Sequence, residues 1–99
     1  LVRKRMHAQV YGRVQGVAFR YYARKQALRL GLSGWVRNVA DGSVELVCEG
    51  YAEDVAQFTE WLRYGPAMAQ VHRLDWRELN LDEENSFLTL DFQIRPTVY

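Results

Sequence analysis

Two glycines, Gly12 and Gly16, lie four residues apart in a short connection between two segments of different periodicity. Apolar and polar side chains alternate over residues 6–11, which predicts a strand with one buried face. Apolar side chains recur at helical spacing over residues 19–30, which predicts an amphipathic helix. Because glycine permits tight backbone turns, this part of the chain is constrained to a strand, a tight loop and a helix in succession.

The loop between these two segments has the chemistry of an anion site. A loop that enters a helix presents unpaired N–H donors and the positive end of the helix dipole, and both attract phosphate. Arg20 lies in the first turn of the predicted helix, where its planar guanidinium can bind two phosphate oxygens at once. The sequence lacks the P-loop pattern of NTPases and the third glycine of a dinucleotide-binding loop. A tight turn beside a solvated arginine remains the alternative.

The other segments predict an α+β fold. Asp41-Gly42 favours a hairpin turn, and Gly65-Pro66 ends the second predicted helix. The order β-α-β-β-α-β plus one strand predicts a ferredoxin-like split βαβ sandwich, with two helices on one face of a mostly antiparallel five-stranded sheet. We expect its first and third strands to be central and parallel. The further strands are expected at residues 32–38, 43–49, 71–79 and 87–94, the second helix at 52–64, and loops at 39–42 and 82–85.

Composition narrows the classes of function. The 99 residues fit a single domain at 6–99, preceded by a flexible basic tail at 1–5. Thirteen basic and twelve acidic residues give a formal charge of +1, which argues against a nucleic-acid binder. The sequence has no apolar run long enough to cross a bilayer and no signal peptide, so we expect no membrane partner. A monomeric cytoplasmic protein is the expectation.

The cysteine, histidine and acidic residues of the sequence are not spaced as in known metal-binding or thiol motifs. The single cysteine, Cys48, cannot form an internal disulfide, which fits a reducing compartment. We expect it to be a buried small hydrophobe, with a reactive thiol as the alternative. His7 and His72 lack metal-ligand spacing, and the acidic residues 82–84 are typical of a solvated loop rather than a Ca²⁺ site. No metal or cofactor is therefore expected.

Asn38 ends the second predicted strand, immediately before the hairpin turn. Asparagine is common in turns because its side chain bonds the nearby backbone. Its amide also has one acceptor and two donors, so it can orient a water molecule. Whether Asn38 reaches the glycine loop depends on the topology of the sheet, and both interpretations stay open.

Two sequence blocks together resemble the acylphosphatase family, over about residues 6–94. The first block is Gly12-Arg13-Val14-Gln15-Gly16-Val17-x-Phe19-Arg20, and the second runs from Leu30-Gly31-Leu32-x-Gly34-Trp35-Val36-Arg37-Asn38 to Asp41-Gly42-x-Val44-Glu45. The resemblance implies a hydrolase that converts acyl phosphates to a carboxylate and phosphate, and for which phosphate or another oxyanion is a competitive ligand. It implies that Arg20 binds the phosphate and that Asn38 positions the attacking water. It also implies a cradle of backbone N–H groups from Gly12, Arg13, Val14, Gln15, Gly16, Val17 and Ala18.

Two other classes of function compete with the enzyme. A non-catalytic domain that only binds anions would keep the loop but would have no need of Asn38. An RNA-binding domain shares the order of strands and helices, but it stacks bases on aromatic residues of its third strand. Residues 43–49 contain no aromatic residue and two glutamates, which argues against RNA.

Overall fold

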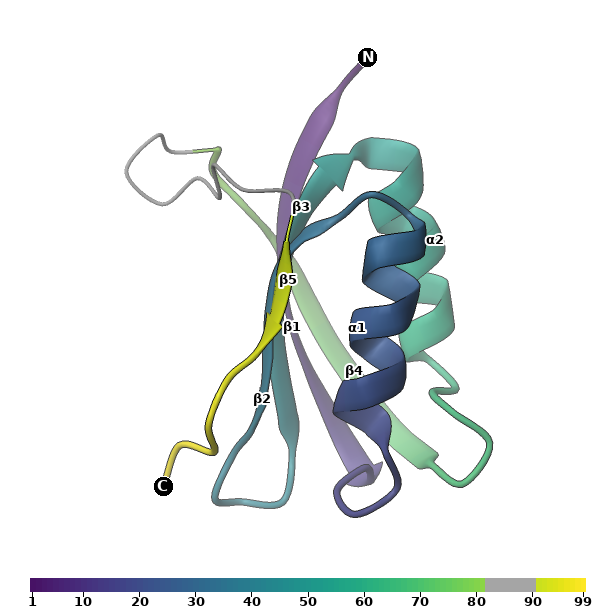
Figure 1. Ribbon diagram of the computed structural model, residues 1–99, viewed down its shortest axis with the longest axis vertical. Helices are drawn as coiled ribbons and strands as arrows, with labels where there is room; N and C mark the ends of the chain where they lie inside the picture. The colour runs from purple at the N-terminus through teal and green to yellow at the C-terminus, as the bar shows by residue number, and fades with distance from the viewer. Residues whose placement is uncertain (82–90) are drawn as a thin grey trace.

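The computed structural model describes residues 1–81 and 91–99, which form a sheet with two helices packed on one of its faces (Figure 1). The predicted loop at 82–85 and the first part of the predicted strand at 87–94 lie outside the described residues. The elements follow the predicted order: β1 (Arg3–Arg13), α1 (Phe19–Arg29), β2 (Ser33–Asn38), β3 (Val44–Tyr51), α2 (Ala52–Leu62), β4 (Gln70–Leu79) and β5 (Phe92–Ile94).

The sheet has the strand order β4-β1-β3-β2-β5. All neighbours pair antiparallel except β2 and β5, which are parallel, so the sheet is mixed but mostly antiparallel. β1 and β3 are adjacent as predicted, but they run antiparallel, and the prediction of a parallel pair was wrong. The hairpin makes β3 antiparallel to β2, and the crossover through α1 makes β2 parallel to β1. Therefore β1 and β2 end at the same edge of the sheet.

The register fixes how far apart these two strand ends lie. Val44 of β3 pairs with Val10 of β1 on one side and with Asn38 of β2 on the other. Asn38 is thus two strands away from Val10, or roughly 10 Å at the usual strand spacing. Only three residues after Val10, β1 ends and the chain enters the glycine loop. Asn38 consequently lies at the edge of the sheet from which that loop projects.

The core lies between the helices and the sheet. The predicted inward residues of β1 are buried, and Cys48 of β3 is buried with them. Burial raises the pKa of the Cys48 thiol to about 12, so it is protonated at neutral pH, and its interpretation as a small hydrophobe is confirmed. Phe92 is also buried, whereas Ile94 is exposed. The buried helix residues are Phe19, Ala23 and Ala27 of α1 and Val55, Phe58, Thr59 and Leu62 of α2.

The start of the chain differs from the flexible tail expected at residues 1–5. β1 begins at Arg3, and the Arg5 side chain is buried. Its Nε donates to Glu49 Oε1 at 2.9 Å, and its Nη1 donates to the carbonyl oxygen of Asn80 at 3.2 Å. Glu49 faces Arg5 directly across the β1–β3 ladder, and this opposite charge compensates the burial of a basic residue. The basic cluster therefore belongs to the sheet.

Candidate active site

A cavity of about 210 Å³ lies where the glycine loop, the start of α1 and the end of β2 meet. Arg20 and Asn38, which the sequence proposed as partners in one site, both line it. The structure thus brings together two side chains that are 18 positions apart in the sequence and come from different elements. The complete lining is Val14, Gly16, Ala18, Phe19, Arg20, Tyr21, Asn38 and Ile94.

Within residues 1–81 and 91–99, no neighbouring side chain neutralises the charge of Arg20. It is the second residue of α1 and is half-buried. Among the described residues its guanidinium has no hydrogen bond and no ion pair. The first turn of α1 also contains no acidic residue. A positive side chain at the positive end of a helix, without a counter-charge, is the electrostatic arrangement that attracts an anion.

The backbone at the start of α1 also has N–H groups to offer. The N-cap residue Ala18 makes no side-chain capping bond in the described structure. The hydrogen bond from Tyr22 N to the carbonyl oxygen of Ala18, at 3.2 Å, is the first of the helix. The N–H groups before Tyr22 therefore have no helical acceptor. Together with the guanidinium of Arg20, they can bind an oxyanion.

Two residues of the loop have left-handed backbone conformations. Gly16 has φ 73°, and Ala18 has φ 60° and ψ 27°. Alanine adopts this region at a cost of about 1–3 kcal/mol, and such strain gathers at binding sites. A left-handed residue beside helical ones forms the concave N–H nest that binds anions. Both residues line the 210 Å³ cavity, where such a nest would act.

The side chain of Gln15 does not line the cavity and instead connects the loop to the β2–β3 hairpin by hydrogen bonds. Its Nε2 donates to the carbonyl oxygens of Val39 at 2.8 Å and Ser43 at 2.9 Å. The hairpin itself is closed by Val39 N, which donates to the Ser43 carbonyl oxygen at 2.9 Å. Asp41 Oδ1 accepts from the backbone N–H of Ser43, also at 2.9 Å. The sequence had suggested only the backbone of Gln15, so this positioning role of its side chain was missed.

Asn38 is positioned by hydrogen bonds of its backbone, which leaves its side-chain amide available to bind a ligand or water. Its carbonyl oxygen accepts from Val98 N at 3.1 Å. Asp41 and Gln15 supply the side-chain bonds of the hairpin, and within the described structure the Asn38 amide makes none. The local role of an asparagine in a turn therefore does not account for Asn38. The half-buried amide lines the cavity instead.

Besides Gln15, three further residues of the predicted cradle do not line this cavity. Gly12 and Arg13 belong to β1 and pair with Val71 and Gln70 of β4. Gly12 has φ 131°, and a Cβ atom there would lie 2.2 Å from the Gln70 carbonyl oxygen, so packing against β4 requires the glycine. Val17 is buried in the core. Their contacts with a bound phosphate stay predictions.

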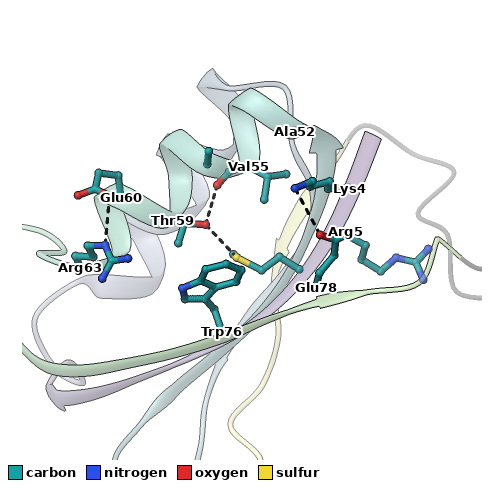
Figure 2. Close-up of a pocket in the computed structure, with 11 residues that line it drawn as sticks. Lys4, Arg5, Ala52, Val55, Thr59, Glu60, Arg63, Trp76 and Glu78 are labelled. Carbon is teal, nitrogen blue, oxygen red and sulfur yellow. Dashed lines mark hydrogen bonds and ion pairs between the residues drawn. The ribbon is translucent and has the colours of Figure 1, made fainter. Parts of the chain in front are cut away.

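A separate cavity of about 230 Å³ lies between α2 and the strands β1 and β4 (Figure 2). None of the predicted site residues lines it. Thr59 donates to the Val55 carbonyl oxygen at 2.8 Å and contacts the sulfur of Met6 at 3.0 Å. The basic residues Lys4 and Arg63 at its rim pair with Glu78 and Glu60. This cavity is therefore less suited to binding an anion than the cavity that Arg20 lines.

Comparisons with known proteins find similar proteins over most of this chain. The profile of the acylphosphatase family matches residues 6–94. An acylphosphatase of Methylococcus capsulatus is 53% identical over 81 residues, which cover 82% of this chain and 88% of the relative. The structure of an acylphosphatase from Coxiella burnetii is 40% identical, with a TM-score of 0.85, and the match covers 94% of this chain and 93% of that one. The Bacillus subtilis acylphosphatase structure is 32% identical, with a TM-score of 0.81 and coverage of 93% and 98%.

The two glycines of the loop should respond differently to alanine. Gly16→Ala places a Cβ in open space, so only the left-handed backbone opposes it, at about 1 kcal/mol. Gly12→Ala forces β1 away from β4, and we expect a loss of about 3 kcal/mol or more. Urea unfolding of both variants measures the difference. Equal losses of stability would contradict the role of Gly12 in sheet packing.

Proposed function

Because this chain is an enzyme of the acylphosphatase family, we propose that it hydrolyses the carboxyl–phosphate bond of acyl phosphates by in-line attack of water. The products are a carboxylate and inorganic phosphate. One observation carries the proposal: Arg20 and Asn38, from two different elements, line one cavity at the N-terminus of a helix. The first can stabilise the phosphoryl group and the second can orient the nucleophile.

The phosphoryl group would be held by positive charge and by N–H donors. Arg20 would bind two of its oxygens through the guanidinium fork, and the backbone N–H groups of the loop would bind the others. These donors are aimed where charge is spread over the phosphoryl oxygens during transfer. A preorganised helix start is suited to this because it needs no rearrangement when the substrate arrives. The half-buried position of Arg20 strengthens the interaction relative to bulk water.

Asn38 would supply the position of the attacking water. The oxygen of its side-chain amide can accept a hydrogen bond from the water, while the NH2 group donates elsewhere than to the phosphate. Water held in line with the bond that breaks reacts as though it were highly concentrated. A carboxylate is a good leaving group, so no strong acid or base is required. This fits a cavity whose lining contains no carboxylate, histidine or cysteine side chain.

The proposal includes no metal ion or other cofactor, since Arg20 and the N–H groups supply the charge stabilisation. Among residues 1–81 and 91–99, no three histidine, cysteine, aspartate or glutamate side chains gather as a potential metal site. No helix in that part of the chain is long and apolar enough to cross a membrane. We further propose that the enzyme acts as a monomer in the cytoplasm and that inorganic phosphate competes with the substrate.

Replacing Arg20 by lysine tests phosphate binding. Arg20→Lys keeps the charge but loses the two-pronged donor, so we expect activity on acetyl phosphate to fall by at least about 10²-fold. Inhibition by inorganic phosphate should weaken as well. Arg29→Lys is the matched control, because Arg29 lies on the same helix, does not line the cavity and, among the described residues, donates hydrogen bonds to Gln26 Oε1. A folded Arg20→Lys enzyme with near-normal kinetics would remove Arg20 from the mechanism.

Replacing Asn38 by alanine tests the water-positioning role. We expect kcat to fall by about 10²-fold or more, the scale of a mispositioned reactant. The inhibition constant of inorganic phosphate should change little, because Arg20 and the loop remain intact. Circular dichroism checks that the hairpin variant is folded. If turnover and phosphate inhibition are lost in parallel, Asn38 binds the phosphate and does not act on water.

A further inference from the structure

The segment that follows β5 runs beside the end of β2 and reaches the hairpin after Asn38 (Figure 1). Its residues 95–98 form a clamp segment. Val98 N donates to the Asn38 carbonyl oxygen at 3.1 Å, and Ala40 N donates to the Val98 carbonyl oxygen at 2.9 Å. Val98 thus binds the residues on both sides of Val39, with which it forms a parallel bridge. The clamp segment therefore fixes the backbone where β2 turns into the hairpin.

The carbonyl group of Asn38 points away from β3 and toward the clamp segment. In an antiparallel pair the N–H and C=O groups of one residue face the same way, and this direction alternates along the strand. Val36, two residues before Asn38, accepts from Arg95 N at 2.8 Å and so shares its direction. Pairing with β3 consequently does not hold the Asn38 carbonyl group, whereas the hydrogen bond from Val98 N does.

We infer that the backbone N–H of Val98 positions Asn38 for the attack of water. The inference rests on the proposed role of Asn38. The Asn38 side-chain amide lines the cavity of about 210 Å³ and makes no hydrogen bond to the described residues, so its direction follows from the backbone that carries it. Fixing the carbonyl group of Asn38 fixes that direction. Val98 does not line the cavity, so it is a positioning residue that acts through Asn38.

The clamp segment is itself anchored on the face of the sheet opposite the helices. Val36 is buried in the core, so the neighbouring Trp35 side chain lies on the other face. The guanidinium of Arg95 lies 4.8 Å from the centroid of a Trp35 ring, and that of Arg37 lies 4.6 Å from it. These cation–π contacts hold the clamp segment against β2. Ile94, directly before the clamp segment, lines the cavity, so one stretch of chain joins the cavity wall to the end of β2.

Replacing Val98 by proline removes the N–H donor, because proline has none. We expect Val98→Pro to lower kcat for acetyl phosphate by about tenfold or more, since a displacement of about 1 Å can cost about a hundredfold in rate. KM and the inhibition constant of inorganic phosphate should keep their wild-type values, because Arg20 and the glycine loop are untouched. Val98→Ala retains the N–H and should retain kcat.

Thr97→Pro is the matched control, because the N–H of Thr97 makes no hydrogen bond to the described residues. This variant should keep the wild-type kcat. Deletion of residues 98–99 removes the Val98 donor without a proline, and Tyr99 is 98% exposed, so no packed side chain is lost with it. We expect the deletion to lower kcat as Val98→Pro does. Circular dichroism checks that each variant is folded.

A double-mutant cycle separates positioning from a general loss of structure. If Val98 acts through Asn38, then Val98→Pro should lower kcat little further in a protein that already carries Asn38→Ala. An equal fall with and without Asn38→Ala would overturn the inference, as would phosphate inhibition that weakens in parallel with kcat. Unchanged kcat in folded Val98→Pro and in the deletion variant would overturn it alone. If Asn38→Ala by itself leaves kcat unchanged, the proposed action of Asn38 on water is wrong, and the role of Val98 with it.

Discussion

The pairing of β3 with both β1 and β2 is the constraint on which the candidate site depends. Val44 faces Val10 on one side and Asn38 on the other, so one row of the sheet sets the position of both strand ends. Because β3 is antiparallel to each neighbour, β1 and β2 run in the same direction and finish at one edge. Had β1 and β3 been parallel, the glycine loop and Asn38 would lie at opposite ends of the molecule. The topology therefore determines whether the two sequence blocks can act together.

Gln15 fixes the position of the glycine loop relative to Asn38 more closely than strand pairing alone does. Its amide donates to two carbonyl oxygens of the hairpin, so a loop with a strained backbone is fastened to the element that carries Asn38. The loop then has different neighbours on its two sides. One side faces the cavity with Arg20 and Asn38, and the other faces a larger cavity of about 630 Å³ that is lined by uncharged residues.

The sequence was most informative where local periodicity and the final packing agree. Apolar spacing predicted both helices within two residues at each end, and Asp41-Gly42 predicted the hairpin. The direction of β1 relative to β3 was misjudged because alternation shows which residues face the core but not how strands run. Residues 3–5 were misjudged because their charges are compensated by Glu49 and Glu78, which are distant in sequence.

The features missed from the sequence depend on contacts between distant segments. The side chain of Gln15 acts through backbone carbonyl oxygens, which leave no mark in the residue types of Val39 and Ser43. Gly65 and Pro66 were interpreted only as a helix stop, although they also line the larger cavity. The adjacent pair Tyr21 and Tyr22 was the available signal, since two exposed aromatic residues directly follow Arg20. That Tyr21 and Tyr22 line two different cavities became apparent only from the fold.

In the proposed mechanism, an arginine, a set of backbone N–H groups and an asparagine suffice to hydrolyse an acyl phosphate. The most direct measurement is the release of inorganic phosphate from acetyl phosphate by protein that has been dialysed against EDTA and is assayed with EDTA present. We expect turnover at the same rate as before dialysis, with no increase when Mg²⁺ is added in excess. Turnover that disappears on chelation and returns with one metal ion would contradict it.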